Sequence, residues 1–187
     1  MRTVQTPLPG VLLIEPDVHR DGRGFFLETY HAGKLEAHGI VTRFVQDNHS
    51  RSVFGTIRGL HLQLRHPQAK LVRVMEGEIY DVAVDVRRGS PTFGKWVGTV
   101  LSGADFIQCY IPAGFAHGFS VLSPEVHVEY KCSDYYDPGA ELGIRWDDPA
   151  PAVDWRVSDP ILSARDRQNP SFADVHHLLP AYSSTDV

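Results

Sequence analysis

Cysteine, methionine and long apolar runs are all scarce in this 187-residue sequence. The two cysteines, Cys109 and Cys132, each lie inside a strand-like run, which fits reduced, buried thiols in a cytoplasmic protein better than a disulfide. No apolar run approaches the length that crosses a membrane. The opening segment MRTVQTPLPGVLLIEPD has no apolar region preceded by positive charge, so we expect no secretory signal. These absences predict a cytoplasmic protein that does not act at a membrane.

An excess of positive charge is also missing. The chain has 18 lysines and arginines against 23 aspartates and glutamates, which gives a formal net charge of −5. Non-specific binding to nucleic acid needs a basic surface, so we expect no nucleic-acid partner. A small anionic ligand is still compatible with this charge, because a few arginines at one place outweigh a weak overall field.

Short β-patterned segments, separated by Gly, Pro and Ser, occupy most of the chain. Segments 70–74 and 78–87 flank a tight turn at Glu76–Gly77 and predict a hairpin. The rhythm continues through segments 94–102, 105–112, 118–123 and 126–133. It predicts an all-β sandwich or barrel.

Helices have few candidates in this sequence. The best one is segment 31–40, and the part after Trp155 predicts turns and short helix packed on the barrel. In the N-terminal part, the segments 10–16 and 24–31 flank a turn-like segment, 17–23. Composition stays mixed on both sides of Pro149–Pro151, so we expect a single domain over residues 1–187.

The stretch RGLHLQLRHPQAK is unusually polar for β-patterned sequence. From Ile57 onward, a strand period of two places Ile57, Gly59, His61 and Gln63 on one face. The same period places Arg58 on the other face with the leucines. The function depends on whether the face with His61 is exposed to solvent, forms a metal site or lines the inside of a pocket.

Ten histidines raise the question of a metal site. Metal-binding cupins, which have a jelly-roll fold, carry a Gly-x5-His-x-His motif, a glutamate soon after it, and a later Pro-x-Gly-x-x-His motif. Gly55 and His61 match the start, and Pro112–His117 matches the later motif. Gln63 replaces the second histidine, and the glutamate is absent. Because a stable divalent-metal site normally has three or four ligands, we expect no metal.

Seven segments match another branch of the same fold, in the order DGRGFFLETY, VQDNHSRS, GTIRGLHLQ, QAKLVRVMEGEIYDVAVDVRRGSPTFGKW, IPAGFAHGFSVLS, EYKCSDYYDPGAELGIRW and LSARD. From about Pro9 to Phe172, the sequence resembles the dTDP-4-dehydrorhamnose 3,5-epimerase family of nucleotide-linked 4-keto-6-deoxysugar epimerases. The resemblance implies an all-β, double-stranded β-helix (a cupin-like jelly roll) with a few short peripheral helices. It also implies a dTDP-4-keto-6-deoxysugar substrate.

The chemistry of such an epimerase requires few groups. A 4-keto group acidifies the protons on C3 and C5. A base removes such a proton, an enolate forms, and an acid returns a proton to the opposite face. This reaction needs a base, an acid and a group that stabilises the enolate charge, so we expect neither a metal nor a redox cofactor.

The resemblance implies catalytic roles for four residues. His61 is the base, a role that suits imidazole because it titrates near neutral pH. Asp166 pairs with His61 and fixes its tautomer. Lys70 stabilises the enolate, and Tyr130 is the acid. Considered singly, each of the four has a structural explanation, and the family pattern as a whole makes the catalytic one better.

The resemblance also implies ten substrate-binding residues: Arg23, Phe26, Glu28, Gln46, Asn48, Arg58, His117, Tyr136, Glu141 and Arg165. Arg58 is expected to pair with the diphosphate, and Tyr136 to stack on the thymine ring. His117 is expected to contact the sugar, with Asp81 as its candidate support.

Three of the ten, Arg23, Phe26 and Glu28, come from the neighbouring subunit in this family. The active unit is therefore expected to be a homodimer. Strand segments 11–16 and 24–30 are the candidates for exchange with a neighbouring sheet edge.

The residues do not decide which carbons are inverted. One alternative is a monoepimerase that inverts C3 or C5 alone in an unusual deoxysugar pathway. A second is a non-catalytic sugar-binding jelly roll, which would be expected to lack His61 or Tyr130. A third is a metal-dependent cupin oxygenase.

Overall fold

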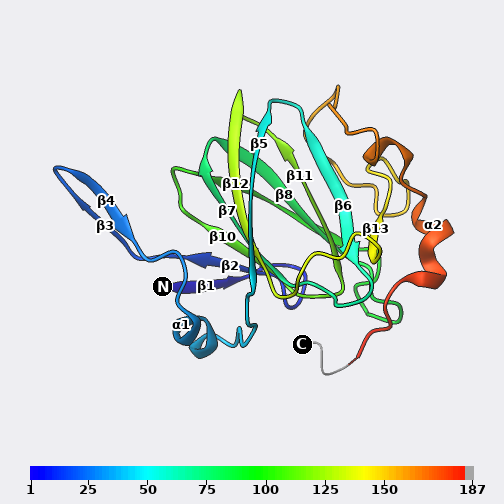
Figure 1. Ribbon diagram of the computed structural model, residues 1–187, viewed down its shortest axis with the longest axis horizontal. Helices are drawn as coiled ribbons and strands as arrows, with labels where there is room; N and C mark the ends of the chain where they lie inside the picture. The colour runs from blue at the N-terminus through cyan, green and yellow to red at the C-terminus, as the bar shows by residue number, and fades with distance from the viewer. Residues whose placement is uncertain (184–187) are drawn as a thin grey trace.

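The computed structural model describes residues 1–183, and its largest elements are two antiparallel sheets (Figure 1). The six-stranded sheet has the order β1 (Arg2–Gln5), β2 (Leu12–Glu15), β10 (Gln108–Ile111), β7 (Lys70–Glu76), β12 (Glu125–Cys132) and β5 (Gln46–Val53). The five-stranded sheet has the order β13 (Glu141–Gly143), β6 (Ile57–Gln63), β11 (Phe115–Val121), β8 (Glu78–Asp85) and β9 (Trp96–Ser102). The predicted all-β jelly roll is confirmed.

The helices are few, short and peripheral, as predicted. They are α1 (Ala32–Ala37), η1 (Asp166–Gln168), α2 (Phe172–Val175) and η2 (His176–Leu178). A capping box fixes the start of α2, since the Ser171 and Asp174 side chains each accept a hydrogen bond from the other residue's backbone N–H. None of the described helices is long and apolar enough to cross a membrane.

The predicted hairpin around Gly77 is wrong. β7 pairs with β10 and β12, whereas β8 pairs with β11 and β9 in the other sheet. Gly77 is therefore a corner at which the chain passes between sheets. Its φ is +83°, and a Cβ there would lie 2.2 Å from the carbonyl oxygen of Glu125. A tight turn between two strands looks the same in a hairpin and in a corner, and distant partners decide between them.

A bulge in β6 overturns the predicted alternation of faces. His61 pairs with His117, but Arg58 pairs with Phe119. Arg58 and His61 are three residues apart along β6, whereas their partners are two residues apart along β11, so β6 contains one extra residue. The extra residue brings Arg58 and His61 to the same cavity. Gly59 sits in the bulge with φ of +112°, and a Cβ on it would lie 2.7 Å from the backbone of the opposite strand.

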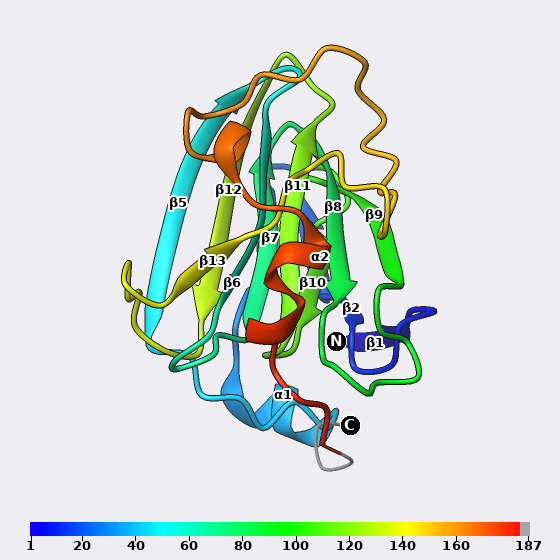
Figure 2. The same cartoon turned by 90° about the vertical axis from the view of Figure 1, so that its right-hand side faces the viewer.

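The space between the sheets divides into an apolar part and a polar part. The apolar part holds buried side chains such as Val74, Ile79, Leu101 and Val128. Complete burial of each such side chain is worth roughly 1.5–3 kcal/mol. The chain from about residue 144 to 179 covers the outer face of the five-stranded sheet (Figure 2), where Trp155 joins a second core cluster. Because these clusters stabilise the fold, the remaining interior is free to hold polar groups.

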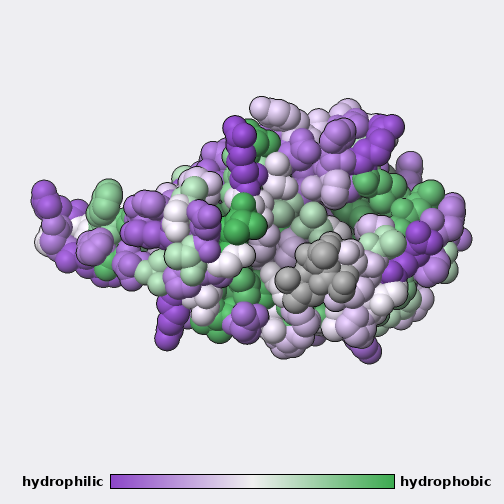
Figure 3. All heavy atoms as spheres, turned by 90° about the horizontal axis from the view of Figure 1, so that it is seen from below, coloured by the Kyte–Doolittle hydropathy of each residue, from purple (hydrophilic) through white to green (hydrophobic). Residues whose placement is uncertain are grey.

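Two strands leave the body as a hairpin, β3 (Val18–Asp21) and β4 (Gly24–Leu27) (Figure 1). Strand β3 occupies part of segment 17–23, which was predicted to be a turn. Figure 3 shows the hairpin extending well beyond the sandwich, with hydrophobic and hydrophilic residues side by side. Phe25 packs on Phe106 with 4.7 Å between ring centroids, while Phe26 is 72% exposed.

The two strands that were expected to exchange with a neighbouring subunit, β2 and β4, differ in whether both of their edges are paired within this chain. Within this chain, β2 pairs with β1 on one side and β10 on the other, and the exchange of segment 11–16 with a neighbour stays a prediction. β4 pairs with β3 along one edge, and the part of the chain that the structure describes supplies no strand to its other edge. Segment 24–30 therefore stays a candidate.

Candidate active site

The polar part of the interior opens into a cavity of about 600 Å³, a size typical of small-molecule sites. Its walls come from β5, β6, β7, β11 and β12, together with the segment before η1. All four predicted catalytic residues and six of the ten predicted substrate-binding residues line it, namely Gln46, Asn48, Arg58, His61, Lys70, His117, Tyr130, Tyr136, Arg165 and Asp166. The polar face of β6 is therefore the inside of a pocket.

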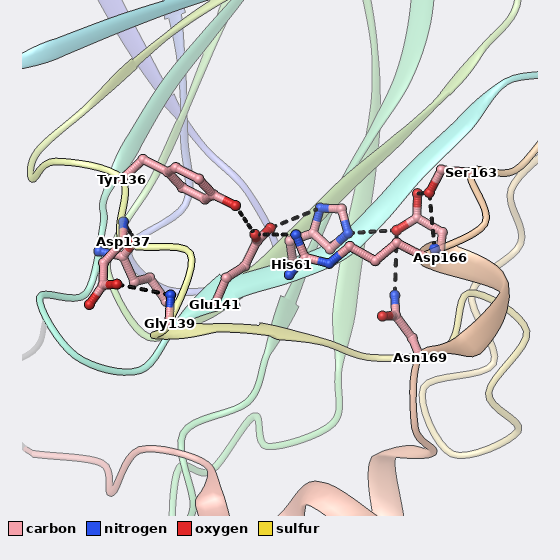
Figure 4. Close-up of polar contacts among 10 residues, drawn as sticks. His61, Tyr136, Asp137, Gly139, Glu141, Ser163, Asp166 and Asn169 are labelled. Atoms are coloured by element: carbon pink, nitrogen blue, oxygen red, sulfur yellow. Dashed lines mark hydrogen bonds and ion pairs between the residues drawn. The ribbon is translucent and has the colours of Figure 1, made fainter.

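His61 and Asp166 form a dyad, although they are 105 residues apart in the chain. His61 Nε2 and Asp166 Oδ1 are 2.6 Å apart (Figure 4). The Ser163 hydroxyl donates to Asp166 Oδ2 at 2.8 Å, and Asn169 donates to Oδ1 at 3.4 Å. Asp166 is buried at the start of η1.

The surroundings of Asp166 keep it ionised. Burial acts to raise the pKa of Asp166, but hydrogen bonds from His61, Ser163 and Asn169 and the charge of His61 outweigh it and hold the pKa below its ordinary value. An ionised Asp166 accepts from Nε2–H of His61, which fixes the tautomer and leaves Nδ1 as the basic nitrogen. His61 can therefore act as a base through Nδ1.

A second histidine–aspartate pair lies in the same cavity wall. His117 faces His61 across the β11–β6 ladder, and its Nε2 lies 2.6 Å from Asp81 Oδ1. Both partners are buried. The structure thus places Asp81 inward, as support for His117, which strand alternation alone did not establish.

Lys70 and Tyr130 come from the six-stranded sheet, which faces the sheet that carries His61. Lys70 Nζ is 6.0 Å from the centroid of the Tyr130 ring. Within residues 1–183, no carboxylate lies at ion-pair distance from Lys70, so its amine is available to a ligand. Burial lowers the pKa of Lys70.

Tyr130 is suited to donate a proton. Burial raises the pKa of its phenol, with the Coulomb interaction with Cys132 acting in the same direction. The hydroxyl therefore keeps its proton at neutral pH. A base on one sheet and a protonated phenol on the other can approach a bound ring from two sides.

Glu141 links two further residues at the cavity mouth. Its Oε2 accepts from the Tyr136 hydroxyl at 2.6 Å and from Arg165 Nη1 at 2.5 Å. Gln46 Oε1 accepts from the backbone N–H of Tyr136 at 2.9 Å, which fixes the base of that side chain. Glu141 itself is not among the residues of the cavity wall, and it lies between Tyr136 and His61 (Figure 4).

Three predicted substrate-binding residues lie away from the cavity of their own chain. Arg23 and Phe26 are on the β3–β4 hairpin, and Glu28 follows it and pairs with Lys34 at 2.8 Å. The prediction assigned these residues to the neighbouring subunit's site.

Gln63, which occupies a cupin metal-ligand position, has a structural role here. Its amide donates to the carbonyl oxygens of His66 and Tyr135 at 2.6 and 3.1 Å and accepts from the Asp137 N–H at 2.9 Å. It fastens the loop after β12 to β6. No cluster of three or more His, Cys, Asp or Glu side chains suited to a metal ion occurs among residues 1–183.

Sequence reasoning did not assign Cys132 and Ser163 to the site. The Cys132 thiol lines the cavity and accepts from the Asn48 amide at 3.4 Å. Both cysteines are free and buried, as expected. Ser163 was detectable, because a serine three residues before an aspartate is a common turn and capping pattern.

A jelly roll that carries the histidine of a histidine–aspartate dyad on one sheet and a partly buried, protonated tyrosine on the other has the groups that an epimerase, an isomerase that works by proton transfer, requires. The sequence profile of dTDP-4-dehydrorhamnose 3,5-epimerase matches residues 5–174. The chain belongs to the dTDP-4-dehydrorhamnose 3,5-epimerase family.

Individual relatives agree with this assignment. The chain is 52% identical over 176 residues to a dTDP-4-dehydrorhamnose 3,5-epimerase of Pseudomonas aeruginosa, covering 93% of this chain and 97% of the relative. A crystal structure of the Legionella pneumophila dTDP-6-deoxy-D-glucose-3,5-epimerase, in complex with dTDP-4-keto-L-rhamnose, is 47% identical, with a TM-score of 0.95 and coverage of 98% and 99%. A 3'-monoepimerase of Streptomyces bikiniensis in complex with dTDP-quinovose is 33% identical, with a TM-score of 0.87 and coverage of 95% and 93%.

Proposed function

We propose that this protein inverts C3 and C5 of a dTDP-4-keto-6-deoxyhexose, as in dTDP-rhamnose and related deoxysugar biosynthesis. The observation that carries the proposal is the placement of His61, paired with Asp166, and Tyr130 on facing sheets of one cavity. Inversion requires removal of a proton from one face of the sugar and its return to the other. Groups on facing sheets meet that requirement.

In this proposal, His61 removes the proton through Nδ1, and Asp166 stabilises the imidazolium that results. Lys70 stabilises the negative charge that develops on the 4-keto oxygen. Tyr130 returns a proton to the opposite face. Since the ketone itself acidifies the C–H bonds, these side chains complete the reaction without a metal or a redox cofactor.

The proposed nucleotide site combines groups from two subunits of a homodimer. Arg58 and Arg165 bind the diphosphate, Gln46 and Asn48 contact base or phosphate, His117 contacts the sugar, and Tyr136 stacks on the thymine. Glu141 positions Tyr136 and Arg165. The partner contributes Arg23, Phe26 and Glu28, a role supported by the projection of the hairpin away from its own cavity and by the exposure of Phe26. We further propose a single domain and a cytoplasmic location, which suits two free thiols.

The proposal is tested by NMR of dTDP-4-keto-6-deoxyglucose with the protein in D2O and EDTA. We expect deuterium at both C3 and C5 and inversion at both carbons. Deuterium and inversion at a single carbon would instead identify a monoepimerase, the second candidate, which the monoepimerase relative at 33% identity brings into consideration. Loss of activity in EDTA, restored by a metal ion, would refute the metal-free mechanism.

Replacing Tyr136 or Arg23 with alanine is expected to weaken nucleotide binding and leave turnover nearly unchanged. The nucleotide does not change during the reaction, so these contacts contribute equally to substrate and transition state. Loss of base stacking in Tyr136→Ala should raise KM about tenfold, which corresponds to roughly 1.4 kcal/mol. Tyr135→Ala, in which an exposed neighbour outside the cavity is truncated, is the matched control. A large fall in kcat at unchanged KM would contradict this placement.

A further inference from the structure

An enzyme that inverts two carbons with one base has to remove the proton from that base after the first inversion, before the second can begin. After the first proton removal, Nδ1 of His61 carries the proton, and Nε2 is held by Asp166. The imidazolium cannot take a proton from the second carbon. A group beside Nδ1 that accepts the first proton and passes it to water would restore the base.

Glu141 stands beside that nitrogen. Its Oε1 is 3.7 Å from His61 Nδ1, on the side of the imidazole opposite Asp166 (Figure 4). Pairing of β13 with β6 holds it there, since Gly143 lies opposite His61 and Glu141 opposite Gln63. Among residues 1–183, Glu141 and Asp166 are the carboxylates within 4.0 Å of the His61 ring nitrogens.

The Glu141 side chain is 13% exposed and contacts a more exposed neighbour. Its other oxygen, Oε2, binds the Tyr136 hydroxyl and Arg165, and the Arg165 side chain is 49% exposed. Burial acts to raise the pKa of Glu141, but hydrogen bonds from Tyr136 and Arg165, with the charges of His61 and Arg165, hold it below the ordinary value. The carboxylate is thus ionised at neutral pH and readily releases any proton it accepts.

The other polar groups around His61 are less suited to accept this proton. Asp166 receives hydrogen bonds on both oxygens and lies at Nε2. Arg58 has no acceptor atom, and Lys70, when protonated, has none either. His117 Nε2 is bonded to Asp81.

We propose that Glu141 carries the proton away from His61 between the two inversions, an inference that rests on the proposed function. The Nδ1–H bond breaks as an Oε1–H bond forms, which returns His61 to neutral imidazole and makes Glu141 a neutral acid. The proton then passes from Oε1 to water, and the carboxylate is restored. The Tyr130 phenolate left by the first proton return takes a proton from water in turn, so that both base and acid are ready for the second inversion. The step requires the 3.7 Å separation to close to hydrogen-bond distance, an adjustment that active sites commonly make when substrate binds.

The test is a single-turnover reaction with protein in excess over dTDP-4-keto-6-deoxyglucose, in which inversion at each carbon is timed. In Glu141→Gln, the amide oxygen can still accept from Tyr136 and Arg165. We expect the first inversion to proceed at about the wild-type rate and the second to slow by at least about tenfold, so that singly inverted sugar accumulates. Equal slowing of both inversions, or of neither, would overturn the proposal.

Two further variants separate proton transfer from positioning. Glu141→Ala should show the same selective defect, and added formate should restore the second inversion by occupying the vacated space as a small carboxylate. Tyr136→Phe removes a hydrogen bond from Oε2 but leaves Oε1 in place, so it should not change the ratio of the two rates. Failure of formate to act would count against proton transfer. A wild-type protein that inverts neither carbon would refute the proposed function, whereas wild-type rate ratios in both Glu141 variants would refute only this role.

Discussion

Replacing His61 with alanine is expected to lower turnover by about 10²–10⁴-fold, the range that general-base catalysis contributes. The variant lacks the atom that takes the proton, and Asp166 Oδ1 lies at the other ring nitrogen, Nε2, rather than at the position of Nδ1. The measurement is the initial rate of inversion, with KM determined in parallel. Since the proposed site places this side chain at the sugar rather than at the nucleotide, KM should change little.

His177→Ala is the matched control for His61→Ala. It removes an exposed histidine in η2 that does not line the cavity, and its activity should equal that of the wild type. Thermal unfolding of both variants checks that the fold is retained. Activity of His61→Ala within a few-fold of the wild type would remove His61 from the role of base.

Replacing Tyr130 with phenylalanine is expected to abolish inversion and preserve proton exchange. The phenyl ring fills the same space, and His61 is left intact to remove a proton and return it to the same face. In D2O, the variant should incorporate deuterium into the substrate without inverting it, while inverted product forms at least about 10²-fold more slowly. NMR of the sugar distinguishes the two events.

Tyr110→Phe provides the control for the loss of a hydroxyl. The Tyr110 hydroxyl bonds Thr42 at 2.7 Å, and Tyr110 does not line the cavity, so this variant should behave as the wild type. Near-normal inversion by Tyr130→Phe would show that water or another residue is the acid. Loss of both exchange and inversion with an intact fold would show that Tyr130 is needed to bind or ionise the substrate.

Sequence motifs were sufficient to identify the catalytic candidates and several other residues of the cavity wall, but not Cys132 or Ser163. Lys70, Tyr130 and Asp166 each have an ordinary structural explanation when considered alone, and only the ordered set of motifs assigned them to one site. The structure brings these residues to one cavity. The pairing of His61 with Asp166 was likewise predicted from the pattern, across 105 residues.

Details of strand pairing could not be predicted in this way. The bulge at Gly59 adds one residue to β6, and a single residue reverses every face after it. The corner at Gly77 depends on the partners of β7 and β8, which are far away in the sequence. The contact between Glu141 and His61 depends on the register of β13, a strand of three residues with little pattern of its own.

The corner at Gly77 also bears on how the chain folds. The strands β7 and β8, on either side of this corner, belong to different sheets. Pairing of β7 therefore requires β10 and β12, and pairing of β8 requires β9 and β11. Long loops must close before β7 pairs with β10 or β12 and before β8 pairs with β11, and such non-local topologies reach their folding transition state slowly. No contiguous half of the chain can build both walls of the cavity. A nascent chain therefore lacks a complete cavity until β11, β12 and the segment that carries Asp166 have been made.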